Sequence, residues 1–128
     1  MEYNNPKITS FRDLIIWQKG ITISKRVYQI CKLLPKEEIF GLVSQMQRCA
    51  VSVPSNIAEG RGRNTRKDFI QFLYIAQGSL FELETQLVIV KDLYKVNIEE
   101  ILQEIHDEQK MISGMINKLK ANTKQQKP

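Results

Sequence analysis

Apolar residues recur along this chain at alternating spacings of four and three, the pattern of a helical face that packs against other helices. One such run begins after Thr65, and a second covers residues 39–57. The longer run consists of Phe69, Leu73, Ala76, Leu80, Leu83, Leu87, Val90 and Tyr94. The shorter run consists of Ile39, Val43, Met46, Ala50, Val53 and Ile57. The pattern predicts long amphipathic helices and an all-α fold.

Capping signals divide this pattern into four helices. We expect the first helix to run from near Phe11 to just before Pro35, the second to begin around Lys36, and the fourth to end near Ala121. Short connections make neighbouring helices antiparallel, so the sequence predicts an up-down-up-down four-helix bundle. The capping pairs are Ser10 and Asp13, Thr65 and Asp68, and Asn97 and Glu100.

The same reading divides the chain into three parts. A single domain over residues 10–121 follows a flexible N-terminus at residues 1–9. A disordered, lysine-rich tail at residues 122–128 comes last.

The second helix contains two signals of irregular backbone. Pro54 removes the amide that would bond to the carbonyl of Ala50, which predicts a kink or a local break. Gly60 is expected to end the helix in the left-handed conformation. Opposite the apolar face, a polar stripe repeats at the same spacing, and it consists of Gln45, Arg48, Ser52, Ser55 and Glu59.

Several apolar residues of the third helix lie off its main seam, where one helical core would leave them uncovered. Large exposed apolar patches usually mark contacts between proteins, so this pattern predicts self-association. The residues concerned are Ile70, Ile75, Phe81, Val88 and Ile89.

The chain of 128 residues is the length of one domain, and no apolar run approaches the 18 residues that a membrane span needs. We therefore expect a soluble, cytoplasmic protein with reduced Cys31 and Cys49. His106 is the only histidine, and no nucleophile, acid–base pair, metal-ligand set or phosphate-binding glycine loop emerges. The sequence thus predicts a protein that is not an enzyme and carries no cofactor or metal.

Positive charge is concentrated in two places. The net charge is +5, and the C-terminal stretch that lacks acidic residues carries Lys118, Lys120, Lys124 and Lys127. The second cluster surrounds the expected turn before the third helix and consists of Arg61, Arg63, Arg66 and Lys67. Guanidinium groups there, beside a helix N-terminus, suit phosphate or an acidic partner as well as they suit a solvated turn.

Asn56 and Glu59 lie on the surface of the second helix near that turn. We expect helix-end hydrogen bonds and a salt bridge from Glu59 to Arg61 or Arg63 in preference to direct ligand contact.

Four segments of the chain resemble a family of four-helix bundle proteins encoded in intervening sequences of bacterial 23S ribosomal RNA genes. The resemblance covers about Phe11 to Tyr94, and the segment Ser52-Val-Pro-Ser-Asn-Ile-Ala-Glu-Gly60 is its most specific part. The other matching segments are Phe11 to Gln18, Gly41 to Arg48 and Phe72 to Glu84.

The same superfamily includes the accessory variability determinant of diversity-generating retroelements. The resemblance implies a homopentamer and, for the retroelement relatives, a basic surface that binds RNA and a reverse transcriptase. Intervening-sequence members have no established biochemical activity. The resemblance marks as motif or assembly positions Ser52, Pro54, Asn56, Glu59 and Gly60.

Two hypotheses follow. The first is a non-enzymatic homo-oligomer that binds RNA or DNA through sequence-independent phosphate contacts from the lysine tail and from Arg48, Arg61, Arg63, Arg66 and Lys67. The alternative is a protein-interaction scaffold or accessory factor. In that case the arginine turn contacts an acidic partner or the next subunit, and the protein has no intrinsic nucleic-acid binding.

Overall fold

The computed structural model describes residues 10–125, and this part of the chain is helical without any strand. The predicted all-α class is confirmed. The predicted flexible segment 1–9 and the last three residues of the predicted tail lie outside the described residues. The main helices are α1 (Ile15–Cys31), α2 (Ser44–Arg61), α3 (Arg66–Tyr94) and α4 (Glu99–Gln125). No helix in the described part is long and apolar enough to cross a membrane.

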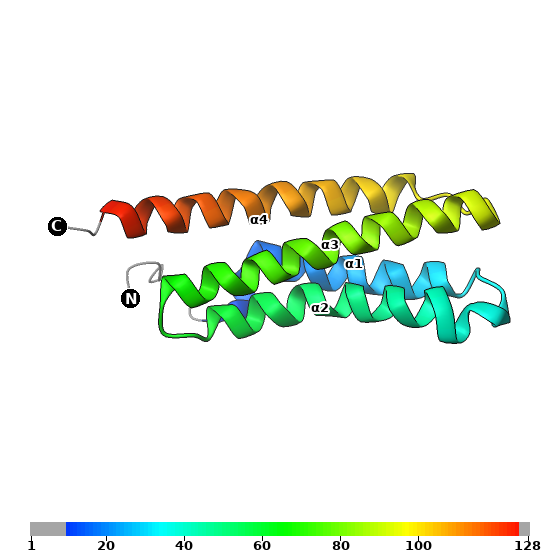
Figure 1. The fold of residues 1–128 in the computed structure, drawn as a ribbon, viewed down its shortest axis with the longest axis horizontal. Helices are drawn as coiled ribbons and strands as arrows, with labels where there is room; N and C mark the ends of the chain where they lie inside the picture. The colour runs from blue at the N-terminus through cyan, green and yellow to red at the C-terminus, as the bar shows by residue number, and fades with distance from the viewer. Residues whose placement is uncertain (1–9, 126–128) are drawn as a thin grey trace.

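The four helices lie alongside one another (Figure 1). α2 and α4 each pack against both α1 and α3. The turn between α2 and α3 lies at the same end of the molecule as the start of α1 and the last turns of α4 (Figure 1). The α1–α2 and α3–α4 connections lie at the opposite end. Residues far apart in the sequence are therefore gathered at each end.

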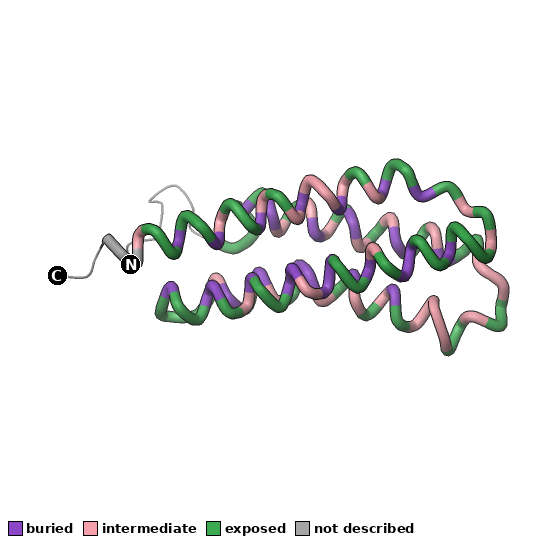
Figure 2. The backbone as a smooth tube through the Cα atoms, turned by 45° about the horizontal axis from the view of Figure 1, so that its top comes forward, coloured by how far each residue is buried: buried purple, intermediate pink, exposed green. Residues whose placement is uncertain are grey.

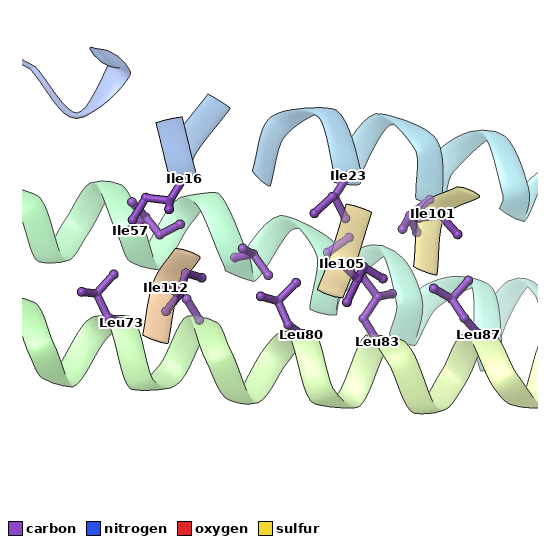
Figure 3. Packing of buried hydrophobic residues seen from close by; sticks show 14 of the residues in the cluster. Ile16, Ile23, Ile57, Leu73, Leu80, Leu83, Leu87, Ile101, Ile105 and Ile112 are labelled. Carbon is purple, nitrogen blue, oxygen red and sulfur yellow. The ribbon is translucent and has the colours of Figure 1, made fainter. Parts of the chain in front are cut away.

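The core lies between the helices, where buried faces line the interior along the length of the molecule (Figures 2 and 3). Both predicted seams enter it. In α2, Met46, Ala50, Val53 and Ile57 are fully buried, and in α3 the seam from Phe69 to Val90 is buried throughout. Burying each large aliphatic side chain contributes about 1.5–3 kcal/mol, so these seams supply a large share of the driving force for folding.

The first helix begins later and ends earlier than predicted. Ser10 does act as a cap, since its hydroxyl accepts from the amide of Arg12 at 3.1 Å, but the turn that follows is a short 3₁₀ helix, Phe11–Asp13. Leu14 then adopts extended backbone (φ −74°, ψ 128°) and is buried, so α1 starts at Ile15. This break places the Leu14 side chain in the core.

The segment before α2 is also irregular. A 3₁₀ turn at Lys36–Glu38 leads into a π-helical turn at Ile39–Val43, in which Gly41 has non-helical dihedral angles. The carboxylate of Glu38 holds this segment, because it accepts from the amide of Leu42 at 3.2 Å and from the hydroxyl of Tyr94 on α3. The prediction of a regular helix from Lys36 is therefore wrong.

Pro54 does not break α2, which runs without interruption from Ser44 to Arg61. The carbonyl of Ala50, which loses its helical donor at Pro54, accepts instead from the hydroxyl of Ser24 on α1 at 3.0 Å. A Cβ atom built on Gly20 would lie 3.2 Å from the Cβ of Pro54, so α1 and α2 approach closely here. The predicted break is wrong because a neighbouring helix satisfies the carbonyl.

Gly60 is not the left-handed stop that the sequence suggested. No glycine in the described residues has a positive φ, and α2 continues past Gly60 to Arg61, where Gly62 (φ −79°) caps it. A Cβ atom on Gly60 would lie 2.6 Å from the Cβ of Phe72 and 3.0 Å from Cδ1 of Phe69. Gly60 is thus required by the close approach of α2 and α3, a role that needs the missing side chain.

The remaining helix ends follow their caps. The hydroxyl of Thr65 accepts from the amide of Asp68 at 3.1 Å, as predicted for the start of α3. Lys95 ends α3 in the left-handed conformation (φ 57°), and the side chain of Asn97 accepts from the amide of Glu99 at 3.0 Å. α4 continues to Gln125, beyond the predicted end near Ala121.

Candidate functional site

Three segments that carry basic residues lie at the end of the molecule that contains the α2–α3 turn (Figure 1). We call this the basic end. Its acidic neighbours are Asp13, Glu59 and Asp68, so positive charge is in excess. Arg12 precedes α1, and Lys118 and Lys120 lie in the last turns of α4. The α2–α3 turn adds Arg61, Arg63 and Lys67, and these six residues define the basic end.

The arginines of the turn differ in how they are held. The guanidinium of Arg63 lies 2.6 Å from the carboxylate of Glu59, which confirms the predicted salt bridge from Glu59 to Arg61 or Arg63. The same guanidinium lies 4.9 Å from the centre of the Phe72 ring. Both members of the pair are about half exposed, so the pair contributes at most about 1 kcal/mol. Its main effect is to orient Arg63.

Arg66 does not belong to the exposed set. It is only 7% exposed, whereas Lys67 is exposed and Arg61 is partly exposed. As the first residue of α3, Arg66 packs beside the core. The prediction that it offers a guanidinium to phosphate at the surface is therefore wrong.

Arg48 is exposed but lies elsewhere. It is on α2, about 20 Å from Arg61 along the helix axis at 1.5 Å per residue. Its Nη2 donates to the hydroxyl of Ser44 at 3.1 Å. The structure therefore separates Arg48 from the basic residues with which the sequence grouped it.

Arg48 lines a polar groove between α2 and α3, a cleft of about 410 Å³. Within it, the hydroxyls of Ser52 and Ser79 lie 2.8 Å apart, and Nδ2 of Asn56 donates to the hydroxyl of Ser52 at 2.9 Å. The motif residue Ser52 thus ties α2 to α3, and Asn56 supports it from within α2, which is consistent with a packing role. The groove is lined by Gln45, Arg48, Cys49, Ser52, Ser79, Glu82 and Gln86.

Neither cysteine forms a disulfide. Burial raises the pKa of the Cys49 thiol above its ordinary value, and the amide of Gln86 donates to its sulfur at 3.6 Å. Burial raises the pKa of the Cys31 thiol as well. A raised pKa reduces the thiolate fraction, so neither site resembles that of an activated nucleophile.

His106 links α4 to α3. Its Nε2 lies 3.1 Å from Oε2 of Glu84, and Nε2 of Gln109 donates to the other oxygen of the same carboxylate at 2.9 Å. These hydrogen bonds lower the pKa of Glu84, and the bond from Gln109 has the larger effect. Among the described residues, no group of histidine, cysteine, aspartate or glutamate has the arrangement of a metal site.

The outward side of α3 is apolar, as the off-seam residues predicted. Ile75, Phe81, Val88 and Ile89 are each more than 40% exposed, whereas Ile70 turns into the core at 9%. Phe40, in the π-helical turn, is 95% exposed.

Sequence reasoning missed Glu108, which is fully buried in α4. The signal was present, because Glu108 falls between Ile105 and Ile112 at the spacings of three and four that mark the buried face. Burial raises the pKa of its carboxyl to about 8, although Lys19 acts in the opposite direction.

Comparison with known proteins identifies a family and a solved structure with a similar fold. A family model described as "23S rRNA-intervening sequence protein" matches residues 12–118. A crystal structure from Bacteroides thetaiotaomicron, described as a protein with unknown function from the S23 ribosomal protein family, is 24% identical and superposes with a TM-score of 0.74. The match covers 80% of this chain and 98% of that one, and it shows a shared fold. No curated protein matches this chain.

Proposed function

Because the chain belongs to the family of 23S rRNA-intervening sequence proteins, we propose that it is a non-enzymatic, cytoplasmic homo-oligomer that binds RNA or DNA at its basic end. Binding proceeds through phosphate contacts that carry no sequence information. Arg61, Arg63 and Lys67 supply the contacts of the turn, and Lys118 and Lys120 supply those of α4. No cofactor, metal or catalytic residue takes part.

The observation that supports this proposal is the convergence of separate basic segments. The α2–α3 turn and the last turns of α4 are about 50 residues apart in the sequence, yet they lie at one end of the molecule (Figure 1). A charged surface built from distant segments suits an extended anion better than a single solvated turn does. The N-terminus of α3 adds positive partial charge beside Lys67.

The test is a fluorescence-anisotropy titration with labelled single-stranded RNA and duplex DNA at several salt concentrations. We expect affinity to fall steeply with salt. In the triple variant Arg61→Ala, Arg63→Ala, Lys67→Ala, the slope of log K against log salt should shrink by about 0.7 per lost contact for a single strand and about 0.9 for a duplex.

Arg48→Ala is the matched control, because it removes an exposed arginine away from the basic end and should leave binding unchanged. Circular dichroism and light scattering show whether each variant keeps its fold and assembly. Wild-type binding that is absent at low salt, or that does not respond to salt, refutes the proposal. So does a folded triple variant that binds as tightly as the wild type.

For the assembly we propose that each subunit is an antiparallel up-down-up-down four-helix bundle and that five subunits associate. The number five rests on the family resemblance. The exposed apolar residues on the outward side of α3 support association, because a solvated helix is rarely apolar on both sides. Light scattering should give about 75 kDa, five times the 14.9 kDa of one chain. Phe81→Glu should lower this mass, and a monomeric wild type at micromolar concentration would rule the assembly out.

A second candidate is a protein-interaction scaffold without intrinsic nucleic-acid binding. It is favoured by the pairing of Arg63 with Glu59, which already occupies one cation of the turn. Replacing Arg61, Arg63 and Lys67 together by Ala separates the two functions. Loss of the oligomer supports the scaffold, and an intact oligomer with lost nucleic-acid binding supports the first proposal.

A further inference from the structure

Glu108 is a carboxylic acid enclosed in the core. It is fully buried on α4, and neither of its carboxyl oxygens has a hydrogen-bond partner among the described residues. A carboxylate without partners in an apolar interior costs several kcal/mol, far more than a protonated carboxyl does. The closed structure therefore strongly favours the neutral form.

The helices around Glu108 offer little compensation for a negative charge. α1 contributes Lys19, which favours the ionised form but makes no direct ion pair with Glu108 in the described structure. α3 contributes Glu84, whose carboxylate is engaged by His106 and Gln109. The buried face of α2 presents only groups that do not titrate: Met46, Ala50, Val53, Pro54 and Ile57.

The direction of the pH effect follows from these surroundings. Burial raises the pKa of Glu108 to about 8 in the closed structure, against 4.5 for a solvated glutamate. A group whose pKa is raised on folding favours the closed form fully below the lower value. That advantage is lost as pH rises toward the upper value.

The interface between α1 and α4 is the least extensive of the four between neighbouring helices, and that between α2 and α3 is the most extensive. Separation of α4 from α1 is thus the opening that disrupts the least packing, although it also breaks the ion pairs of Arg26 on α1 with Glu100 and Glu104 on α4. It is also the opening that admits water to the carboxyl of Glu108, while Lys19 stays on α1 and moves away from that carboxyl.

We propose that Glu108 is a proton-dependent latch between α4 and α1. In the closed form the carboxyl is neutral and lies in the core. When α4 separates from α1, the carboxyl releases its proton to water, and the ionised group is stabilised by solvent. Rising pH therefore shifts the molecule toward the open form. The last turns of α4 carry Lys118 and Lys120, so opening also displaces part of the basic end.

In the open form α4 has lost part of the packing that stabilises it, so we expect its backbone hydrogen bonds to break more often and its amides to exchange. The test is hydrogen exchange of the full chain, followed at backbone amides by NMR between pH 5 and pH 9 and corrected for the intrinsic exchange rate. In the wild type, the opening equilibrium of α4 should rise about ten-fold per pH unit and level off above pH 8. Between pH 5.5 and pH 7.5 the rise should be about a hundred-fold. Amides of α2 and α3 should not share it.

Glu108→Gln keeps the shape of the side chain without the charge, so opening of α4 in this variant should not depend on pH. Glu99→Gln, the same change at an exposed position of α4, should behave as the wild type. Lys19→Met should move the plateau to higher pH. The proposal is overturned if Glu108→Gln retains the wild-type pH dependence, or if the carboxyl carbon of Glu108 titrates near pH 4.5 in the closed protein. It is also overturned if α2 and α3 open together with α4.

Discussion

One glycine lies within each of the four α-helices, and the structure assigns these glycines different responses to an added methyl group. At Gly60, a Cβ atom would lie 2.6 Å from the Cβ of Phe72, which is fixed close to the backbone of α3 and has little room to move. At Gly78 and Gly114, a Cβ atom would have no neighbour within 4 Å. The same change from glycine to alanine therefore creates a close contact at Gly60 and meets open space at Gly78 and Gly114.

The magnitudes follow from two terms. Alanine inside a helix is favoured over glycine by about 1 kcal/mol. Overpacking a tight contact costs about 1–3 kcal/mol, and separations below 3.0 Å belong at the upper end of that range. We expect Gly60→Ala to lower the free energy of unfolding by about 2 kcal/mol. Gly78→Ala and Gly114→Ala should raise it by up to about 1 kcal/mol.

The assay is urea denaturation followed by circular dichroism at 222 nm, with all variants at one protein concentration because subunit association would contribute to stability. Gly62→Ala is a further control, since Gly62 ends α2 with a negative φ and the nearest atom to an added Cβ is 3.6 Å away. Its effect should stay within about 0.5 kcal/mol. If Gly60→Ala proves as stable as Gly78→Ala, the close approach of α2 and α3 is not what requires a glycine there.

Three further outcomes are expected. Ser24→Ala deprives the Ala50 carbonyl of its cross-helix donor and should lower the free energy of unfolding by about 1–2 kcal/mol in urea; no change would show that water replaces the hydroxyl. Thr65→Ala should cost about 1 kcal/mol by the same assay and Thr65→Ser much less, because serine retains the capping oxygen. The phenol of Tyr94 and the amide of Leu42 lower the pKa of Glu38. The ionised carboxylate therefore stabilises the fold fully above the ordinary pKa of glutamate. This stabilisation is lost as the pH falls through the lowered pKa of Glu38. Tyr94→Phe should therefore weaken the protein at pH 7 and weaken it less under acid conditions, which acid titrations of stability would reveal; a deficit that does not depend on pH would contradict this reasoning.

The helical class, the buried seams and the cap at Thr65 were predictable because each depends on residues close in sequence. A seam such as Leu73, Leu80 and Leu87 has the period of the helix itself, and a capping hydroxyl bonds three residues away. Such features depend only on residues within a few positions of one another, so they can be recognised in the sequence.

The wrong predictions share a different cause, since each was decided by another helix. The carbonyl freed by Pro54 is satisfied by Ser24, which is 26 residues from Ala50 in the sequence. Gly60 is required by Phe72 across the α2–α3 contact. The burial of Arg66 depends on where α3 begins relative to the core. Such pairings are set by how the helices approach, which periodicity within one helix does not specify.

Most of the basic residues of the candidate site could be predicted from the sequence, but which residues lie together could not. The arginine turn and the lysines of α4 were recognisable from charge alone, and the fold places them at one end. Arg48 was grouped with them because it shares their charge, but helix geometry separates it from them. Glu108 was overlooked because only apolar residues were used to trace the buried faces.

Phe72 connects two properties that are usually studied separately. Its Cβ touches the space left empty by Gly60, and its ring lies beneath the guanidinium of Arg63. A change at Gly60 that displaces Phe72 would also displace Arg63. A genetic screen scored only by nucleic-acid binding would then report Gly60 as a contact residue, although it has no side chain with which to make a contact. Binding and stability must therefore be measured on the same variants before this turn is mapped by mutation.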